Sequence, residues 1–439
     1  MLVRIEAFEP QNTMAPLQTP QFEEHLTSAF LNLSRALDET ISATGAQAAM
    51  PQDVARRLKI SRNLTWKVSK LVGGTDPYTA LQHMPGDEGM EILLKASAAA
   101  GVSETMLEQV RQAQRALREV IGLHAGDRAT FDLMLDGMGG ANSGERLDAS
   151  RKLAFRGNSG IWGIQARARL NTFFLTPSTS DPDMLEYMLV SGLLDLRRLR
   201  ANVSWPLFRP RYFSTDGLPW TRGSSAADSG GEPRRAQTAS RAGDMGGRAA
   251  IATDLNRGFQ ILPEFCSPDD PPIAIRHDQS GMVCMLEEGP IGNGGATTCY
   301  FGELIRNAAP RFAVEGSRFA ELFAQIMLPV ETLQIDLIVH KSFEWGLQPR
   351  VEMRGRIELD GFQNPPIIPI ADQPHRLAGR PPVLQTPLTD RYEEIIASVM
   401  ERAGWDLRDF NAVRLVVPYP PMHTMTVLRC PLPDKPTSA

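Results

Sequence analysis

The chain has 439 residues, with 46 basic and 51 acidic side chains and a formal net charge of −5 at pH 7. This acidity excludes a protein that is basic throughout and coats nucleic acid indiscriminately. Hydrophobic residues make up 42% of the sequence and charged residues 22%, which is the composition of a globular protein and excludes general disorder. At roughly 100–200 residues per domain, we expect two or three domains.

The sequence carries no sign of a membrane segment or of an oxidising environment. It has no apolar run of about 18 residues, and its beginning lacks the apolar core of a secretory signal. Its four cysteines form no CxxC pair, which favours buried, reduced thiols over a disulfide or zinc framework. We therefore expect a cytoplasmic protein without membrane partner, metal or cofactor, in which residues 1–18 form a loose leader.

Residues 19–140 carry the apolar spacing of helices and contain no convincing run of alternating residues. Thr19 and Pro20 provide a cap and a first turn for a long helix that runs to about residue 43. Ser103 caps a second long helix. Shorter helical patterns occupy about 87–100 and 127–136. This part of the chain is predicted to be an all-α module.

Within this module, residues 51–73 have the spacing of two short helices joined by a tight turn. Pro51 begins the first helix, and Ser61 is placed to cap the second. Ala55 provides the small residue that is needed where the two helices cross, and Ile60 provides the apolar residue that fills the turn. The spacing therefore predicts a helix-turn-helix pair.

The charge of this segment differs from that of the rest of the chain. Six basic residues and one acidic residue between 51 and 73 give a local charge of +5, which leaves −10 for the remainder. A basic patch on an acidic body suits selective contact with phosphates. We expect base or groove contacts from Arg62, Asn63, Thr65 and Lys67. We expect phosphate contacts from Arg56, Arg57, Lys59, Ser61 and Lys70.

The stretch VARRLKISRNLTWKVSKLV resembles the Ala-x-x-Leu-x-Ile-Ser-Arg pattern of bacterial helix-turn-helix transcriptional regulators. The resemblance covers residues 51–73 only. It departs from the pattern at Lys59, where a turn glycine is usual, and at Leu64, which falls one position early. The resemblance implies binding to double-stranded DNA, usually as a homodimer, together with a further domain that senses an unidentified small-molecule effector or mediates self-association.

Two other functions remain open at the level of the sequence. Paired helices also occur in bundles that never contact DNA, so the chain is alternatively a non-enzymatic interaction or assembly protein whose helical module packs on its own C-terminal domain. Trp66 fits either function, as a contact to the DNA backbone or as a residue that packs against the helix at 19–43. A third hypothesis is an enzyme without a recognisable motif.

After the helical module, the spacing of the apolar residues changes from that of helices to the alternation that is typical of strands. A helix is expected over about 143–158, followed by a half-buried strand at 164–171 whose polar face is basic, either as a solvated surface or as an anion, ligand or partner surface. Residues 184–200 fit one helix or two strands broken at Ser191 and Gly192, and we favour the strands. The segment 143–213 is thus a helix plus a β segment. The Gly/Ser/Arg-rich stretch 214–250 predicts a flexible loop.

Residues 251–439 are expected to form an α+β domain for ligand sensing or oligomerisation. Its predicted elements are a hairpin around 292–295, a helix from Ser317, an antiparallel strand pair with one wet face at 333–339 and 350–359, a helix at 390–403, and strands near 412–417 and 424–430. For the enzyme hypothesis, Asp336, His340 and Glu352 are candidates to converge across the strand pair, although we favour a solvated or structurally paired polar face for these residues. The predicted fold is multi-domain, with an all-α helix-turn-helix module followed by an α+β region of mainly antiparallel sheet.

Overall fold

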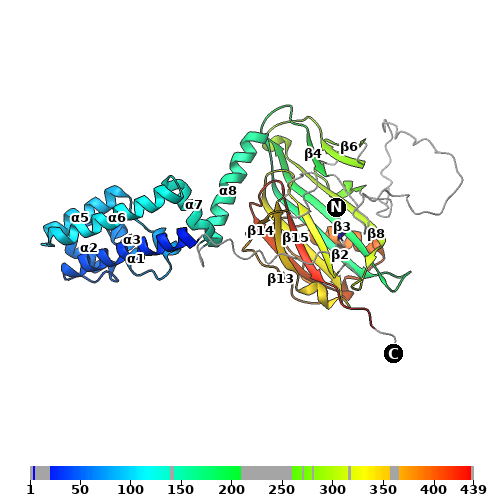
Figure 1. Ribbon diagram of the computed structural model, residues 1–439. Helices are drawn as coiled ribbons and strands as arrows, with labels where there is room; N and C mark the ends of the chain where they lie inside the picture. Colours follow the sequence, from blue (N-terminus) through cyan, green and yellow to red (C-terminus); the bar gives the residue numbers. More distant parts are fainter. Residues whose placement is uncertain are drawn as a thin grey trace. The chain divides into compact units, whose positions relative to one another are not determined.

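The computed structural model describes residues 3–4, 20–138, 143–208, 260–268, 271–278, 281–314, 318–355 and 365–436 (Figure 1). The chain divides into two compact units. One is Pro10–Leu147, and the other joins Met1–Glu9 to Asp148–Ala439. The predicted loop at 214–250 lies outside the described residues, as does the predicted leader except for strand β1 (Val3–Arg4), whose backbone pairs with Glu321 and Leu322.

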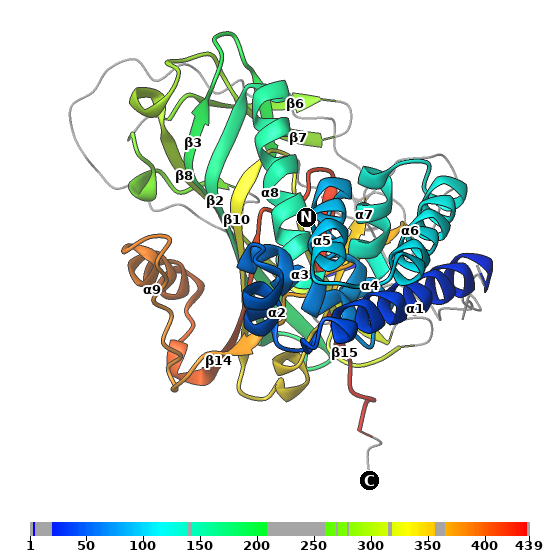
Figure 2. The ribbon, with the colours of Figure 1, turned by 90° about the vertical axis from the view of Figure 1, so that its left-hand side faces the viewer.

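The first unit, which we call the helical unit, is built from seven helices. They are α1 (Pro20–Ala43), α2 (Pro51–Leu58), α3 (Arg62–Val72), α4 (Pro77–Leu81), α5 (Asp87–Ala99), α6 (Glu104–His124) and α7 (Arg128–Met138). Apolar side chains from all of them form one continuous core. The two long helices α1 and α6 pack side by side (Figures 1 and 2). Their apolar stripes have the predicted spacing of three and four residues.

The second unit, which we call the β-rich unit, contains most of helix α8 (Ser143–Trp162), whose first residues belong to the helical unit, and is dominated by a seven-stranded sheet. The strands of that sheet, in spatial order, are β13 (His375–Arg376), β14 (Phe410–Pro418), β10 (Val330–His340), β2 (Ile164–Pro177), β3 (Met184–Arg198), β8 (Thr297–Pro310) and β5 (Gln260–Ile261). Strands β10 and β2 are parallel, and the other neighbours are antiparallel. The expected mainly antiparallel α+β region is therefore confirmed.

Two smaller sheets complete this unit. The five-stranded sheet has the order β1, β9 (Phe319–Gln325), β15 (Thr424–Pro431), β11 (Arg350–Gly355) and β12 (Ile367–Ile368). The three-stranded sheet has the order β4 (Trp205–Phe208), β7 (Gly281–Leu286) and β6 (Ile273–Asp278). Short 3-10 turns lie at Pro263–Phe265, Asn293–Gly295, Glu344–Leu347 and Leu407–Asp409.

The β-rich unit is layered around its largest sheet. One face of the seven-stranded sheet packs against the five-stranded and three-stranded sheets through a large apolar core, which includes the cysteines Cys266, Cys284, Cys299 and Cys430 as buried, free thiols. Helix α9 (Tyr392–Ala403) covers the opposite face (Figure 2). Both faces of the central strands are therefore buried.

This layering corrects the prediction for residues 164–171, which were expected to form a half-buried strand, because the strand is covered on both faces. On β2, Phe173 packs into one core and Phe174 into the other, and Arg169 is buried as well. The segment 184–200 forms a strand, as favoured, but a continuous one. Gly192 lies within it because a Cβ atom there would be 2.5 Å from the ring of Tyr300.

The helix predicted from Ser317 is wrong. Phe319–Gln325 is strand β9, and it pairs with β15 along its whole length. Ala320, Leu322 and Ala324 point into the large core, whereas Phe323 packs with Val427 on the opposite face. Apolar residues on both faces of a strand produce a spacing that resembles that of a helix, and pairing with a distant strand decides the outcome.

Two further expectations about strand pairing are wrong. Residues 292–295 do not join a hairpin, because β7 and β8, the strands on either side, belong to different sheets. The strands predicted at 333–339 and 350–359 are not partners either, because β10 lies in the seven-stranded sheet and β11 in the five-stranded sheet. In addition, the polar face of β10 is not wet, since Asp336 is fully buried.

In the described part of the chain, none of the helices is both long enough and apolar enough to cross a membrane.

Candidate nucleic-acid interface

The helix-turn-helix pair consists of α2 and α3. Proline is the first residue of α2, and its fixed φ angle suits the start of a helix. Val54 and Leu58 of α2 face the core of the helical unit. Helix α3 faces the same core with Leu64, Val68 and Leu71. The two helices therefore share one buried side, and the remaining side of α3 is available for contacts outside this unit.

The turn between the helices is made without glycine. Lys59 has φ 53° and ψ 38°, which is the left-handed conformation that glycine adopts most easily. Ile60 packs against the helical core, and the Ser61 hydroxyl accepts a hydrogen bond from the backbone N–H of Leu64 at 3.3 Å. The sequence thus builds the usual tight turn and places a lysine at its most strained position.

This conformation leads to a prediction for Lys59. Replacing Lys59 with glycine should raise the free energy of unfolding of the helical unit by about 1 kcal/mol, because glycine has no Cβ atom to strain the left-handed turn. Thermal unfolding followed by far-UV circular dichroism measures the change. Lys59→Ala is the matched control, since it removes the same charge but keeps the Cβ atom. Equal melting temperatures for the two variants would contradict the prediction.

The free side of α3 carries the predicted polar residues. Arg62, Asn63 and Lys70 are exposed, and Lys67 is partly exposed. Spacings of one, four and eight residues from Arg62 place Asn63, Trp66 and Lys70 along one side of the helix. Among the described residues, no ion pair joins a carboxylate to Arg62, Lys67 or Lys70.

The arginines of α6 are paired with carboxylates, in contrast to the basic residues of α3. On α6, Arg111 lies 2.6 Å from Glu104, and Arg115 lies 2.6 Å from Glu108. On the same helix, Arg118 lies 2.6 Å from a carboxylate of α5. The charges of α6 are therefore largely balanced within its own surface, whereas those of α3 are not.

Trp66 lies on this exposed side of α3. Its ring contacts His83 edge to face, with the ring centroids 5.1 Å apart, and the Lys70 ammonium lies 5.9 Å from the Trp66 ring centroid. Trp66 nevertheless remains 44% exposed. The indole therefore forms part of the same surface as the basic residues and steadies the side chain of Lys70 by a cation–π contact.

The expected phosphate contacts lie on α2 and in the turn. Arg56 and Arg57 both lie near Asp53, at 3.7 Å and 3.5 Å, and Arg57 also donates to the backbone carbonyl of Thr44. These ion pairs are exposed, so they are weak and leave the guanidinium groups able to exchange partners. Lys59 is exposed as well, whereas the oxygen of Ser61 is engaged in capping α3.

Thr65 is the exception among the predicted base contacts. Its side chain is only 1% exposed, and its hydroxyl donates to the backbone carbonyl of Arg62 at 3.1 Å. Thr65 precedes Val68 by three residues, which places it on the buried side of α3. It is therefore removed from the set of base contacts, which leaves Arg62, Asn63 and Lys67.

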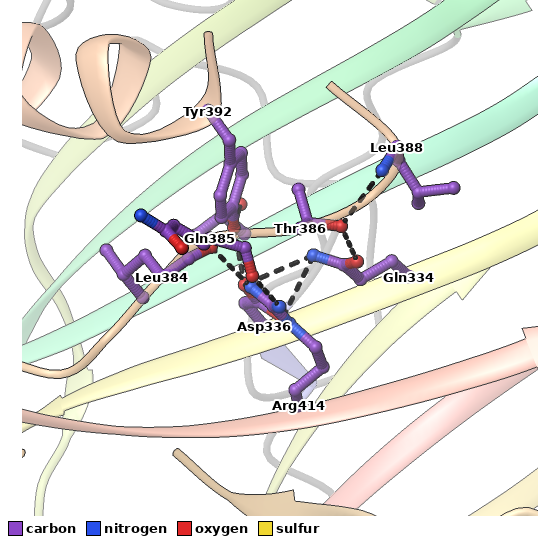
Figure 3. A network of polar contacts seen from close by, with 9 residues as sticks. Gln334, Asp336, Leu384, Gln385, Thr386, Leu388, Tyr392 and Arg414 are labelled. Atoms are coloured by element: carbon purple, nitrogen blue, oxygen red, sulfur yellow. Dashed lines mark hydrogen bonds and ion pairs between the residues drawn. The ribbon is translucent and has the colours of Figure 1, made fainter. Parts of the chain in front are cut away.

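A second polar cluster lies in the β-rich unit, around Asp336 of β10 (Figure 3). Arg414 of β14 donates to both carboxylate oxygens of Asp336, at 2.8 Å and 2.7 Å. The Tyr392 hydroxyl donates to the same carboxylate at 2.7 Å, and its oxygen also lies 2.7 Å from the Thr172 hydroxyl. Burial and the charge of Asp336 raise the pKa of Tyr392 well above its ordinary value, so the phenol keeps its proton and donates.

Arg414 also donates to the backbone carbonyls of Leu384 and Gln385 (Figure 3). We therefore assign this cluster, the Asp336 network, to holding β10, β14 and α9 together. Asp336 does not converge with His340 and Glu352, as the enzyme hypothesis would require. His340 bonds Ser342 at the end of β10, and Glu352 pairs with Arg354 in the other sheet.

Among the described residues, no group of three or more His, Cys, Asp or Glu side chains is placed to hold a metal ion. Comparison of the chain with protein-family models found no match, and comparison with curated proteins found none. The candidate interface therefore rests on its own geometry and charge: a helix-turn-helix pair that presents unpaired basic residues, an amide and an indole on one side of its second helix.

Proposed function

We propose that the protein is a DNA-binding transcriptional regulator that inserts α3 into the major groove of double-stranded DNA. The observation that supports this most strongly is the set of basic residues on the free side of α3, Arg62, Lys67 and Lys70, which have no carboxylate partner within the described residues. Side chains whose charge is not balanced by their own protein are the ones that gain most from neutralising phosphates.

The arrangement suits a helix-turn-helix protein in detail. The 11 residues of α3 span about 16 Å, and the major groove, about 12 Å wide, admits a helix. Arg62 and Asn63 lie in the first turn of α3, the part of the second helix that contacts base edges in this motif. Arginine pairs with guanine and asparagine with adenine through two hydrogen bonds each. Arg56, Arg57, Lys59 and Lys70 would contact phosphates.

The other parts of the proposal follow from this mode of binding. A homodimer would present two copies of α3 to two half-sites one helical turn apart. The β-rich unit would then sense an effector or mediate self-association, and the protein would act in the cytoplasm.

Binding of the full chain to random-sequence duplex DNA, measured by fluorescence anisotropy at low salt, tests the proposal. We expect wild-type binding that weakens steeply as the salt concentration rises. The variant Arg62→Ala/Lys67→Ala should bind at least about tenfold more weakly, and the slope of log affinity against log salt should fall by about 1 to 2.

The matched control is Arg111→Ala/Arg115→Ala on α6. It removes the same number of positive charges from the surface of the same unit, but from residues that are paired with carboxylates. We expect its affinity for DNA to remain within about twofold of wild type. An absence of wild-type binding at low salt, or an equal loss of affinity in the control, would refute the proposal.

A further inference from the structure

Arg169, on β2 of the β-rich unit, is a buried cation. Its side chain points into the large core, and the residue is only 4% exposed. The guanidinium carbon lies 5.1 Å from the ring centroid of Phe208, a residue of β4 in the neighbouring three-stranded sheet. Strand β2 is central in its own sheet, so the guanidinium lies between two layers of β structure.

The hydrogen bonds of Arg169 are incomplete. Its Nε atom donates to the side-chain oxygen of Asn171 at 3.0 Å, and the Ser191 hydroxyl donates to the same oxygen at 3.4 Å. The Nη1 atom of Arg169 is fully buried and has no hydrogen-bond partner among the residues that the structure describes. In the described part of the chain, no carboxylate forms an ion pair with this guanidinium.

A buried guanidinium without a balancing charge destabilises the folded protein. Burial lowers the pKa of Arg169 to about 10, which still leaves the group positively charged at neutral pH. A buried charge without a partner strongly destabilises a fold. Two other buried arginines of this unit form ion pairs, Arg414 with Asp336 and Arg151 with Asp372 at 2.9 Å. Buried Arg198 forms no ion pair among the described residues, but the charge of Glu288 acts on its pKa, whereas burial alone acts on the pKa of Arg169. Within the described residues, Arg169 therefore lacks a balancing negative charge.

We propose that the β-rich unit binds a small oxyanion, a carboxylate or phosphate group, at the Nη1 edge of Arg169. The guanidinium would supply the charge and a donor, and the Ser191 hydroxyl on the neighbouring strand lies close enough to the shared Asn171 oxygen to turn toward the same anion. The inference stands on these contacts alone and does not depend on DNA binding by α3. It also gives the unit a ligand class, anionic small molecules.

The test is thermal unfolding of the full chain in a buffer free of oxyanions. Sodium phosphate, sodium acetate or sodium chloride is added at equal ionic strength. A ligand that binds only the folded state raises the melting temperature until the site is saturated. We expect a rise of at least about 2 °C with phosphate or acetate over chloride. A response to phosphate alone identifies a phosphate site, and a response to acetate alone identifies a carboxylate site.

Two variants link the response to Arg169. Arg169→Met removes the charge and should abolish the response. Asn171→Asp keeps the size of the side chain and supplies a carboxylate where the amide oxygen now lies 3.0 Å from Nε, so it should raise the melting temperature without added anion and abolish the response. The Asp variant tests the proposal even where the Met variant does not fold. Identical wild-type melting in all three salts, or an unchanged response in Asn171→Asp, would overturn it.

Discussion

Replacing Arg414 with methionine is expected to lower the free energy of unfolding of the β-rich unit by about 3–5 kcal/mol. Asp336 is completely buried, and in the variant it would lose both hydrogen bonds from the guanidinium, at 2.8 Å and 2.7 Å. The carbonyls of Leu384 and Gln385 would lose their donor at the same time. Urea denaturation followed by near-UV circular dichroism measures this loss.

We expect most of this loss of stability to come from the buried charge of Asp336, which no longer has a partner in Arg414→Met. A second variant separates this effect from the attraction within the Asp336–Arg414 ion pair. Asp336→Leu/Arg414→Met removes both partners and replaces them with apolar side chains of similar volume, so most of the lost stability should return. If the double variant is as unstable as Arg414→Met alone, the lost stability does not come from the unpaired charge of Asp336, and our account of the Asp336 network is wrong.

Replacing Leu33 with alanine is expected to destabilise the helical unit by about 2–5 kcal/mol. Leu33 is fully buried on α1 and packs into the core shared by all seven helices, so the truncation leaves a cavity. Leu31→Ala on the same helix is the matched control, because Leu31 is 52% exposed, and we expect a change below about 0.5 kcal/mol. Far-UV circular dichroism, which is dominated by helices, follows the transition.

These two experiments also test the division of the chain. Each unit has its own apolar core, so Leu33→Ala should lower the transition of the helical unit, and Arg414→Met that of the β-rich unit. A single transition that both variants lower equally would contradict this division.

The helices and the strongest strands were predictable from the sequence because their pattern is local. The apolar stripe of α1 and the glycine at 404 that ends α9, with φ 73°, are examples. Strand β9 was not predictable in this way, because Phe319, Leu322 and Phe323 have a spacing that fits a helix equally well. What makes it a strand is β15, which lies about a hundred residues further along the chain.

The same distinction applies to the candidate sites: residues placed by a local pattern were predictable, and residues placed by distant parts of the chain were not. Arg62, Asn63 and Lys70 were expected on an exposed helix face, and the period of α3 alone places them there. Thr65 was misplaced because it lies at the edge of the buried stripe. The basic character of the β2 face was visible in the sequence, but the burial of Arg169 was not, because it depends on a layer of β structure formed by distant parts of the chain.

The Asp336 network has a consequence for how this sequence is free to vary. Asp336, Tyr392 and Arg414 come from three separate elements, and each satisfies a polar group of another. Replacing Arg414 alone would leave the buried charge of Asp336 without its ion-pair partner, and replacing Asp336 alone would leave that of Arg414. In any lineage that keeps this fold, Asp336 and Arg414 should therefore be replaced together or not at all, although they lie on different strands and 78 residues apart in the sequence.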